Sequence, residues 1–415
     1  MPWLTGTAFL HSAIVQQKKN MLKVWNVVLI IATYLLCIFG TFLTRSGVVS
    51  SVHAFAESEV GVYFITFIAI AGVASVVLIV SRLDYLESES TFESIVSRES
   101  SFLFNNLVFL GACFAVFWGT VYPVFSEAVQ GDKITIGPPF FNSIYVPLGL
   151  FILFLTGVAP LLAWRRTSLR SLRRNFLRPT LLSLAAAVLL FVLGIRQPAP
   201  LIAFSLVMFV TLAIVIEFSR GVAARIRARG ESFPTALVRL VARNKRRYGG
   251  YIVHFGIVLM FVGFSGAAFN QESQGELDVG DSVSIGRYTL RCESLDEKDT
   301  PNYFCLEAAL AVTKNDKPVT MLYPQKRVYR ASEQATSEIA IRSTLKEDLY
   351  VVFAGLTEDE KAVIQVYLNP LVSWLWLGGL VMGLGTIICI LPEARTQRVR
   401  GKAALDRLLS TTGKV

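Results

Sequence analysis

The chain has 415 residues, of which 53% are hydrophobic and 17% charged, and its mean hydropathy is +0.54. A soluble domain could not bury that much apolar surface in one core, so the composition excludes a water-soluble enzyme and predicts a polytopic membrane protein. The formal net charge of +10 does not indicate a nucleic-acid-binding face, because the basic residues lie mostly in loops between apolar spans.

The first segment, residues 1–15, is uncharged and largely apolar, and Lys18 and Lys19 follow it. A bilayer span needs about 20 apolar residues, so we expect this segment to be part of a helix. It does not resemble a signal peptide, because positive charge follows the apolar run instead of preceding it.

Eight apolar stretches then predict membrane-spanning helices. They cover residues 24–44, 60–79, 103–125, 143–164, 180–193, 199–218, 248–269 and 371–391. The stretch 180–193 is short for a span. Basic loops are expected at 165–178 and 220–247.

Residues 270–365 differ from the rest of the chain. They are polar and alternate with period two at 282–285 and 338–342, and Asn315-Asp316 is a turn signal. We therefore expect a mainly α fold, a polytopic transmembrane helix bundle with one small β-rich periplasmic domain between the last two spans. The expected domains are 1–269 (first helix partial), 270–365, 366–391, and a basic tail at 392–415.

The distribution of Lys and Arg predicts the orientation. Four of the five segments on the side of Lys18 are rich in basic residues, whereas the opposite loops have few, so the positive-inside rule places the Lys18 side in the cytoplasm. The β-rich segment then lies outside, which in a bacterium is the periplasm.

The chain contains only three histidines: His11, His53 and His254. His11 precedes Lys18 by seven residues and His254 follows Arg247 by seven, so each lies roughly 10 Å inside the cytoplasmic edge of a helix. Two imidazoles at matched depth could bind one metal ion between them. The alternative is that each only forms a hydrogen bond across helices. His53 lies beyond the opposite edge, out of reach of the other two.

Five cysteines are present without CxxC spacing, which indicates neither a zinc site nor a redox motif. Cys292 and Cys305 lie in the expected outer domain, and the sequence leaves open whether they form a disulfide. Lys326 and Arg327 in that domain are either solvated or available to an anionic group.

Several segments resemble the CcmF/CcsA haem-handling family, and within it CcmF, the haem lyase subunit of cytochrome c-type biogenesis. They include GTFLTRSG at 40–47, GPPFFN at 137–142 and RYGGYIVH at 247–254. The full set covers 1–12, 40–55, 137–142, 247–254, 301–303, 324–329, 348–350 and 374–379. The similarity extends over essentially the whole chain.

The resemblance implies a role in attaching haem by thioether bonds to the CxxCH segment of apocytochrome c, as a haem lyase (holocytochrome c synthase) activity within a complex. It implies that His11 and His254 are axial ligands of haem b, and that His53 ligates incoming haem during transfer. The implied partners are a haem chaperone, apocytochrome c and other maturation subunits of the bacterial inner membrane. No nucleic acid is implied.

One departure from the family pattern is the lack of the tryptophan-rich haem-binding segment and a second outer histidine, which the family has upstream of residue 1. We expect either an internal start or a second polypeptide that carries this N-terminal half.

Two other functions stay open. A membrane transporter would fit the number of spans, although the sequence shows no internal repeat. A bis-histidine b-type subunit linked to quinol oxidation would also need paired membrane histidines, but it would not explain the outer domain.

Overall fold

The computed structural model describes residues 1–48, 60–88 and 93–392. The chain forms two compact units. The first comprises Met1–Leu184 and Leu212–Ile214, and the second comprises Ala185–Thr211 and the residues from Val215 onward.

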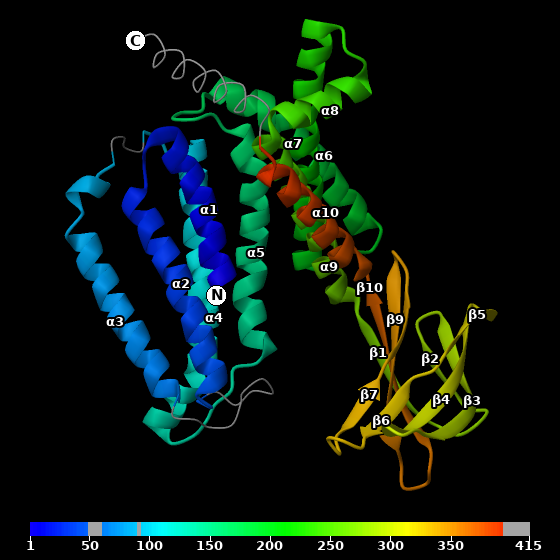
Figure 1. Cartoon of the computed structure of the whole chain (residues 1–415). Coiled ribbons are helices and arrows are strands. Elements are labelled where there is room, and N and C mark those ends of the chain that lie inside the picture. The colour runs from blue at the N-terminus through cyan, green and yellow to red at the C-terminus, as the bar shows by residue number, and fades with distance from the viewer. Residues whose placement is uncertain (49–59, 89–92, 393–415) are drawn as a thin grey trace, which may run out of the picture. The chain divides into compact units, whose positions relative to one another are not determined.

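The first unit is helical. Its helices are α1 (Pro2–Lys19), α2 (Lys23–Arg45), α3 (Val60–Val80), the 3₁₀ turn η1 (Asp84–Leu86), α4 (Arg98–Gln130), α5 (Pro138–Leu161) and the start of α6 (Leu169–Val192). Helix α1 packs against both α2 and α4, while α3 packs on α2 and α5 on α4 (Figure 1).

The second unit contains most of α7 (Pro198–Arg229), α8 (Phe233–Arg243), α9 (Lys245–Gly266), the 3₁₀ turn η2 (Ala267–Phe269) and α10 (Ser373–Ile390). Among the described residues, eight helices are long and apolar enough to cross a membrane, and α1 is not one of them. The predicted fold class, a polytopic helix bundle with one β-rich domain, is confirmed.

Two expectations about the basic segments were wrong. Helix α6 begins at Leu169, inside the arginine-rich segment taken as a loop, and the segment 220–247 contains the end of α7 and the whole of α8. Arginine is a good helix former, so backbone hydrogen bonding continues where hydropathy falls. Hydropathy marks the part of a helix that suits lipid, not where the helix ends.

Helices α9 and α10 approach one another closely. Gly249, Gly256 and Gly263 recur every seven residues on α9, and Gly378 and Gly385 do so on α10. A Cβ atom on Gly256 would lie 2.6 Å from the carbonyl oxygen of Gly378, and one on Gly378 would lie 2.5 Å from that of Gly256. Small residues at such a contact let the two backbones meet, as is common in membranes.

The part of the sequence between α9 and α10 forms a β-sandwich (Figure 1). The strands are β1 (Gln271–Leu277), β2 (Ser282–Ile285), β3 (Tyr288–Asp299), β4 (Tyr303–Lys314), β5 (Lys317–Leu322), β6 (Gln325–Tyr329), β7 (Ala335–Glu338), β8 (Ala340–Ser343), β9 (Glu347–Leu356) and β10 (Ala362–Pro370). One sheet has the order β1-β10-β9-β8, and the other β2-β3-β4-β6-β7 with β5 also paired to β4. Strand β10 runs past residue 365, and α10 begins only at Ser373.

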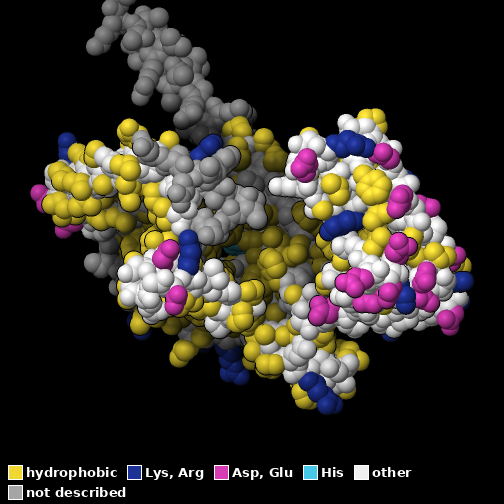
Figure 2. Space-filling view, turned by 90° about the horizontal axis from the view of Figure 1, so that it is seen from below, with side chains coloured by type: hydrophobic (Ala, Val, Ile, Leu, Met, Phe, Trp, Pro, Cys, Tyr) yellow, Lys and Arg dark blue, Asp and Glu magenta, His cyan; other side chains and the backbone are white. Residues whose placement is uncertain are grey.

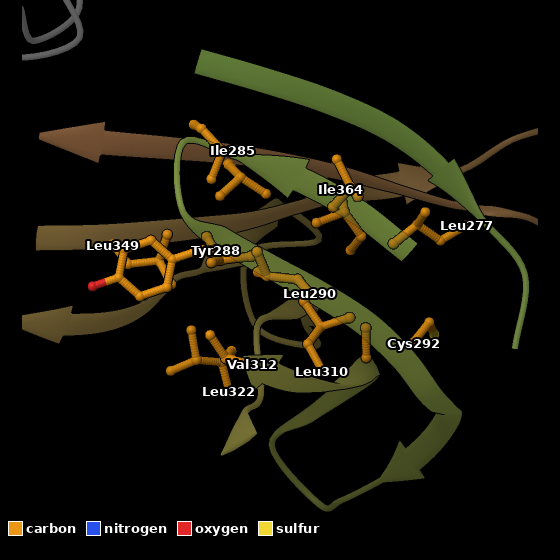
Figure 3. Close-up of a cluster of buried hydrophobic side chains, with 14 of the residues drawn as sticks. Leu277, Ile285, Tyr288, Leu290, Cys292, Leu310, Val312, Leu322, Leu349 and Ile364 are labelled. Atoms are coloured by element: carbon orange, nitrogen blue, oxygen red, sulfur yellow. The ribbon is translucent and has the colours of Figure 1, made fainter. Parts of the chain in front are cut away.

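The two sheets enclose one apolar core, in which Leu290, Leu310, Leu349 and Ile364 are fully buried (Figure 3). The predicted turn at Asn315-Asp316 joins β4 to β5, and both residues have positive φ, 49° and 63°. This is the backbone of a two-residue hairpin turn, in which Asn and Asp are favoured.

The open question of a disulfide is also resolved. Cys292 pairs in register with Leu310, whereas Cys305 lies five residues earlier on β4. That separation is roughly 16 Å along the strand, beyond the reach of a disulfide. Both thiols are free and buried, and burial raises the pKa of Cys292.

The two kinds of structure have different surfaces. In Figure 2 the sandwich carries many scattered Asp, Glu, Lys and Arg side chains, whereas the helical parts expose large areas of apolar side chains. Helix α3 is the clearest case, with exposed side chains such as Val62, Tyr63 and Ile70. An apolar surface of this kind suits lipid rather than water.

Candidate functional site

His11 lies in the middle of α1, half-buried against α4. Its Nδ1 donates a hydrogen bond to the carbonyl oxygen of Thr7 at 2.8 Å. Its ring stacks on Phe109 and lies tilted against Phe102, at centroid distances of 6.2 and 5.9 Å. In a neutral imidazole with the proton on Nδ1, the lone pair is on Nε2, and this is how histidine ligands of metals are commonly oriented.

Polar contacts fix α1 on its neighbours. Asn106 of α4 is fully buried, and its amide, oriented to satisfy both ends, donates to the carbonyl of Ala8 at 3.0 Å and accepts from the indole of Trp25 at 3.2 Å. Thr33 of α2 donates to Thr5 at 2.8 Å. These bonds set the rotation of α1 about its axis, and with it the direction of His11.

His254 lies on α9, on the side away from α10. The three glycines define the face of α9 that meets α10. At about 100° per residue, His254 points roughly 160° away from Gly256. The ring is half-buried there.

A buried acidic residue of α7 contacts α9 one helical turn before His254. Glu217 of α7 is 7% exposed and accepts hydrogen bonds from Arg247 at 2.5 Å and from Tyr251 at 3.2 Å. Tyr251 precedes His254 by one helical turn. The Glu217 carboxylate therefore ties the first turns of α9 to α7 and fixes the rotation of α9 that aims His254.

Glu217 is not among the residues predicted from the sequence. A signal for it is present, because it is the only acidic residue within the apolar stretch 199–218. An ionisable residue inside a span is costly and needs a partner, and this cost points to a nearby cation such as Arg247.

The three predicted ligands are not brought together by what the structure describes. His11 belongs to the first unit and His254 to the second. His53 lies outside the described residues. The assignment of all three as ligands stays a prediction. Within the described part of the chain, no group of three or more His, Cys, Asp or Glu side chains could bind a metal ion.

Lys326 and Arg327 have partners inside the sandwich. Lys326 donates to Ser337 at 3.1 Å, and Arg327 donates to Gln325 at 2.7 Å and lies over the ring of Tyr303 at 4.5 Å. These contacts hold β6 against its neighbouring strands.

Comparison with known proteins gives consistent results. Residues 268–370 match the family described as CcmF C-terminal beta-sandwich. The chain is 32% identical to cytochrome c-type biogenesis protein CcmF of Pseudomonas aeruginosa, over 100% of this chain and 62% of the relative. It is 34% identical to CycK of Rhizobium meliloti (98% and 60%) and 32% identical to CcmF of Escherichia coli (96% and 60%).

A solved structure, cytochrome c heme lyase CcmF, superimposes with a TM-score of 0.75 at 29% identity, covering 94% of this chain and 58% of that one. The chain thus spans about three-fifths of the length of the relatives it matches.

Proposed function

The chain belongs to the CcmF family of cytochrome c-type biogenesis proteins, and on that premise we propose that it is a haem-binding membrane component of cytochrome c maturation. Its role would be to hold haem and promote thioether attachment to the CxxCH segment of apocytochrome c. The activity would belong to a complex in the bacterial inner membrane that includes a haem chaperone and other maturation subunits.

We propose that His11 and His254 are the axial ligands of a haem b. The observation that carries this is the hydrogen bond from His11 Nδ1 to Thr7, which leaves the lone pair on Nε2. Both residues lie on continuous helices, α1 and α9, seven residues from Lys18 and Arg247 respectively. The equal helical rise supports equal depth.

Haem and the side chains of this chain would have different roles. Bound haem would supply the iron and the vinyl groups to which cysteine thiols add. The residues of this chain bind and orient: Thr7 and Phe109 hold the His11 ring, and Glu217 with Tyr251 sets the direction of His254. A buried bis-histidine site suits electron transfer better than binding of an external ligand.

The first test is the spectrum of the purified protein. We expect a low-spin bis-imidazole haem, and we expect His11→Ala and His254→Ala each to lose most of it. His53→Ala is the matched control, because the same substitution outside the buried pair should leave this haem in place. Full haem occupancy in either of the first two variants would disprove the ligand assignment.

We also propose that the sandwich lies in the periplasm and the C-terminal tail in the cytoplasm. An alkaline phosphatase fusion at Lys317, directly after the β4–β5 turn, should be active, and one in the tail should be inactive. A well-expressed but inactive Lys317 fusion would reverse the orientation.

His53 is proposed to act in transfer rather than in the buried site. A haem held there would need a second ligand and an aromatic platform, which the family carries in its N-terminal part. Co-expression with a polypeptide containing that part should give holocytochrome c, and His53→Ala should abolish it while the buried haem persists. Unchanged activity of that variant would remove His53 from the mechanism.

A further inference from the structure

The β-sandwich contains a cavity of about 390 Å³ at the end of the core. Three basic residues, Arg287, Lys314 and Lys346, line it together with one acidic residue, Glu347. Tyr288 also lines it, and Figure 3 shows its ring among core side chains with the hydroxyl directed away from Leu290. The wall of the cavity therefore carries an excess of positive charge.

The single carboxylate is already neutralised within the protein. Glu347 accepts from Lys314 at 2.5 Å and from the Tyr288 hydroxyl at 2.9 Å. Burial by itself would raise the pKa of Glu347, but these hydrogen bonds lower it, so the pair stays charged at neutral pH.

Arg287 and Lys346 are the remaining cations. Both are exposed, and within the described ranges neither makes a salt bridge to an acid, although the charge of Arg287 helps to lower the pKa of Glu347. With Lys314 they give the cavity wall three cations against one carboxylate, and this excess of positive charge suits an anion such as phosphate, which Arg and Lys both bind well.

The cavity lies where the sandwich joins its two membrane helices. Gln271, on the wall, is the first residue of β1 and lies two residues after the end of the candidate span 245–269. The loop that contains Lys346 is bound to the start of α10. The backbone N–H of Leu371 donates to the Lys346 carbonyl at 2.9 Å, and the indole of Trp374 donates to the Leu345 carbonyl at 2.9 Å.

Residues that directly flank a membrane span are expected at the level of the lipid head groups. Trp374 lies in the first turn of a candidate span, where tryptophan anchors helices at the membrane–water boundary. Leu345, beside the cavity loop, is 62% exposed. Leu345 directly precedes Lys346 in the chain, so an apolar side chain suited to the acyl region and a cation suited to the phosphate lie on the same loop.

We propose that this cavity binds the phosphate head group of an anionic phospholipid. Its volume lies within the range of small-molecule sites, about 300–1,000 Å³. The bound lipid would bridge the Arg287 turn and the Lys346 loop, and so tether the sandwich to the membrane next to α9 and α10.

The test uses the full chain reconstituted in nanodiscs and then analysed by native mass spectrometry for retained lipid. Wild-type protein should retain phosphatidylglycerol in preference to phosphatidylcholine. Arg287→Gln/Lys346→Gln should reduce that preference about 30-fold, the effect of two basic residues at a membrane surface. Lys346→Gln alone should reduce it several-fold, and its exposed, unpaired side chain makes a folding defect unexpected.

The matched control is Arg291→Gln/Lys361→Gln, which removes one Arg and one Lys from the same sandwich outside the cavity. It should retain phosphatidylglycerol like wild type. Equal retention of the two lipids by wild-type protein would overturn the proposal, as would equal loss in both double variants. Displacement of the lipid by millimolar inorganic phosphate in wild type would identify a free-phosphate site and would also overturn it.

Discussion

The two helices that carry the described histidines are held by different forces. Helix α1 contacts α2 and α4 through hydrogen bonds of Asn106, Thr33 and Thr5, whereas α9 contacts α10 through glycines that let the backbones meet. Hydrogen bonds between membrane helices contribute modestly, while close packing cannot accommodate even one extra methyl group. We therefore expect the α9–α10 contact to be the less tolerant of substitution.

The largest loss of folding free energy is expected for Gly378→Ala. The new Cβ would lie 2.5 Å from the backbone of Gly256, which cannot move aside without moving α9. Overpacking of this kind costs about 3 kcal/mol. The free energy of unfolding in mixed detergent, followed by circular dichroism, measures this cost.

Gly379→Ala is the matched control, because among the described residues no atom outside its own stretch of helix backbone lies within 4 Å of the position of its Cβ. It should unfold like wild type. Equal stability of the two alanine variants would mean that α9 and α10 do not depend on this contact.

An intermediate loss of folding free energy is expected for Asn106→Leu, which leaves the Trp25 indole without its partner and removes the bond that the Ala8 carbonyl accepts besides its own helical one. An unsatisfied buried group costs about 2 kcal/mol, and His11 would lose its fixed direction. The free energy of unfolding and the haem content should both decrease. Asn105→Leu is the control, since within the described residues the Asn105 amide nitrogen makes no hydrogen bond. If Asn105→Leu were the more damaging, polar contacts would not be what holds α1.

The smallest loss of folding free energy is expected for Thr33→Val, which removes the hydrogen bond to Thr5 and keeps the side-chain shape. Interhelical bonds in membranes average about 0.6 kcal/mol. Thr41→Val serves for comparison, because within the described residues the Thr41 hydroxyl donates only to the Cys37 carbonyl of its own helix. A cost for Thr33→Val as large as that of Gly378→Ala would abolish the difference between the two helices.

Composition and periodicity determined much of this protein. Apolar runs of about 20 residues predicted the eight candidate spans, because backbone groups in lipid must pair within a helix. Alternation in 270–365 and the Asn315-Asp316 turn predicted the β-rich domain, since both depend on neighbouring residues. Helix ends at Leu169 and Arg229 were missed, because hydropathy does not report backbone hydrogen bonding.

Other features depend on contacts between residues far apart in sequence, and only the tertiary structure decided them. Gly256 and Gly378 are separated by the whole sandwich, so no local pattern pairs them. Glu217 meets Arg247 only because α7 and α9 pack together, and Arg287 faces the same cavity as Lys346 only because two sheets close on one core. Local sequence sets the elements, while burial and charge pairing decide which of them meet.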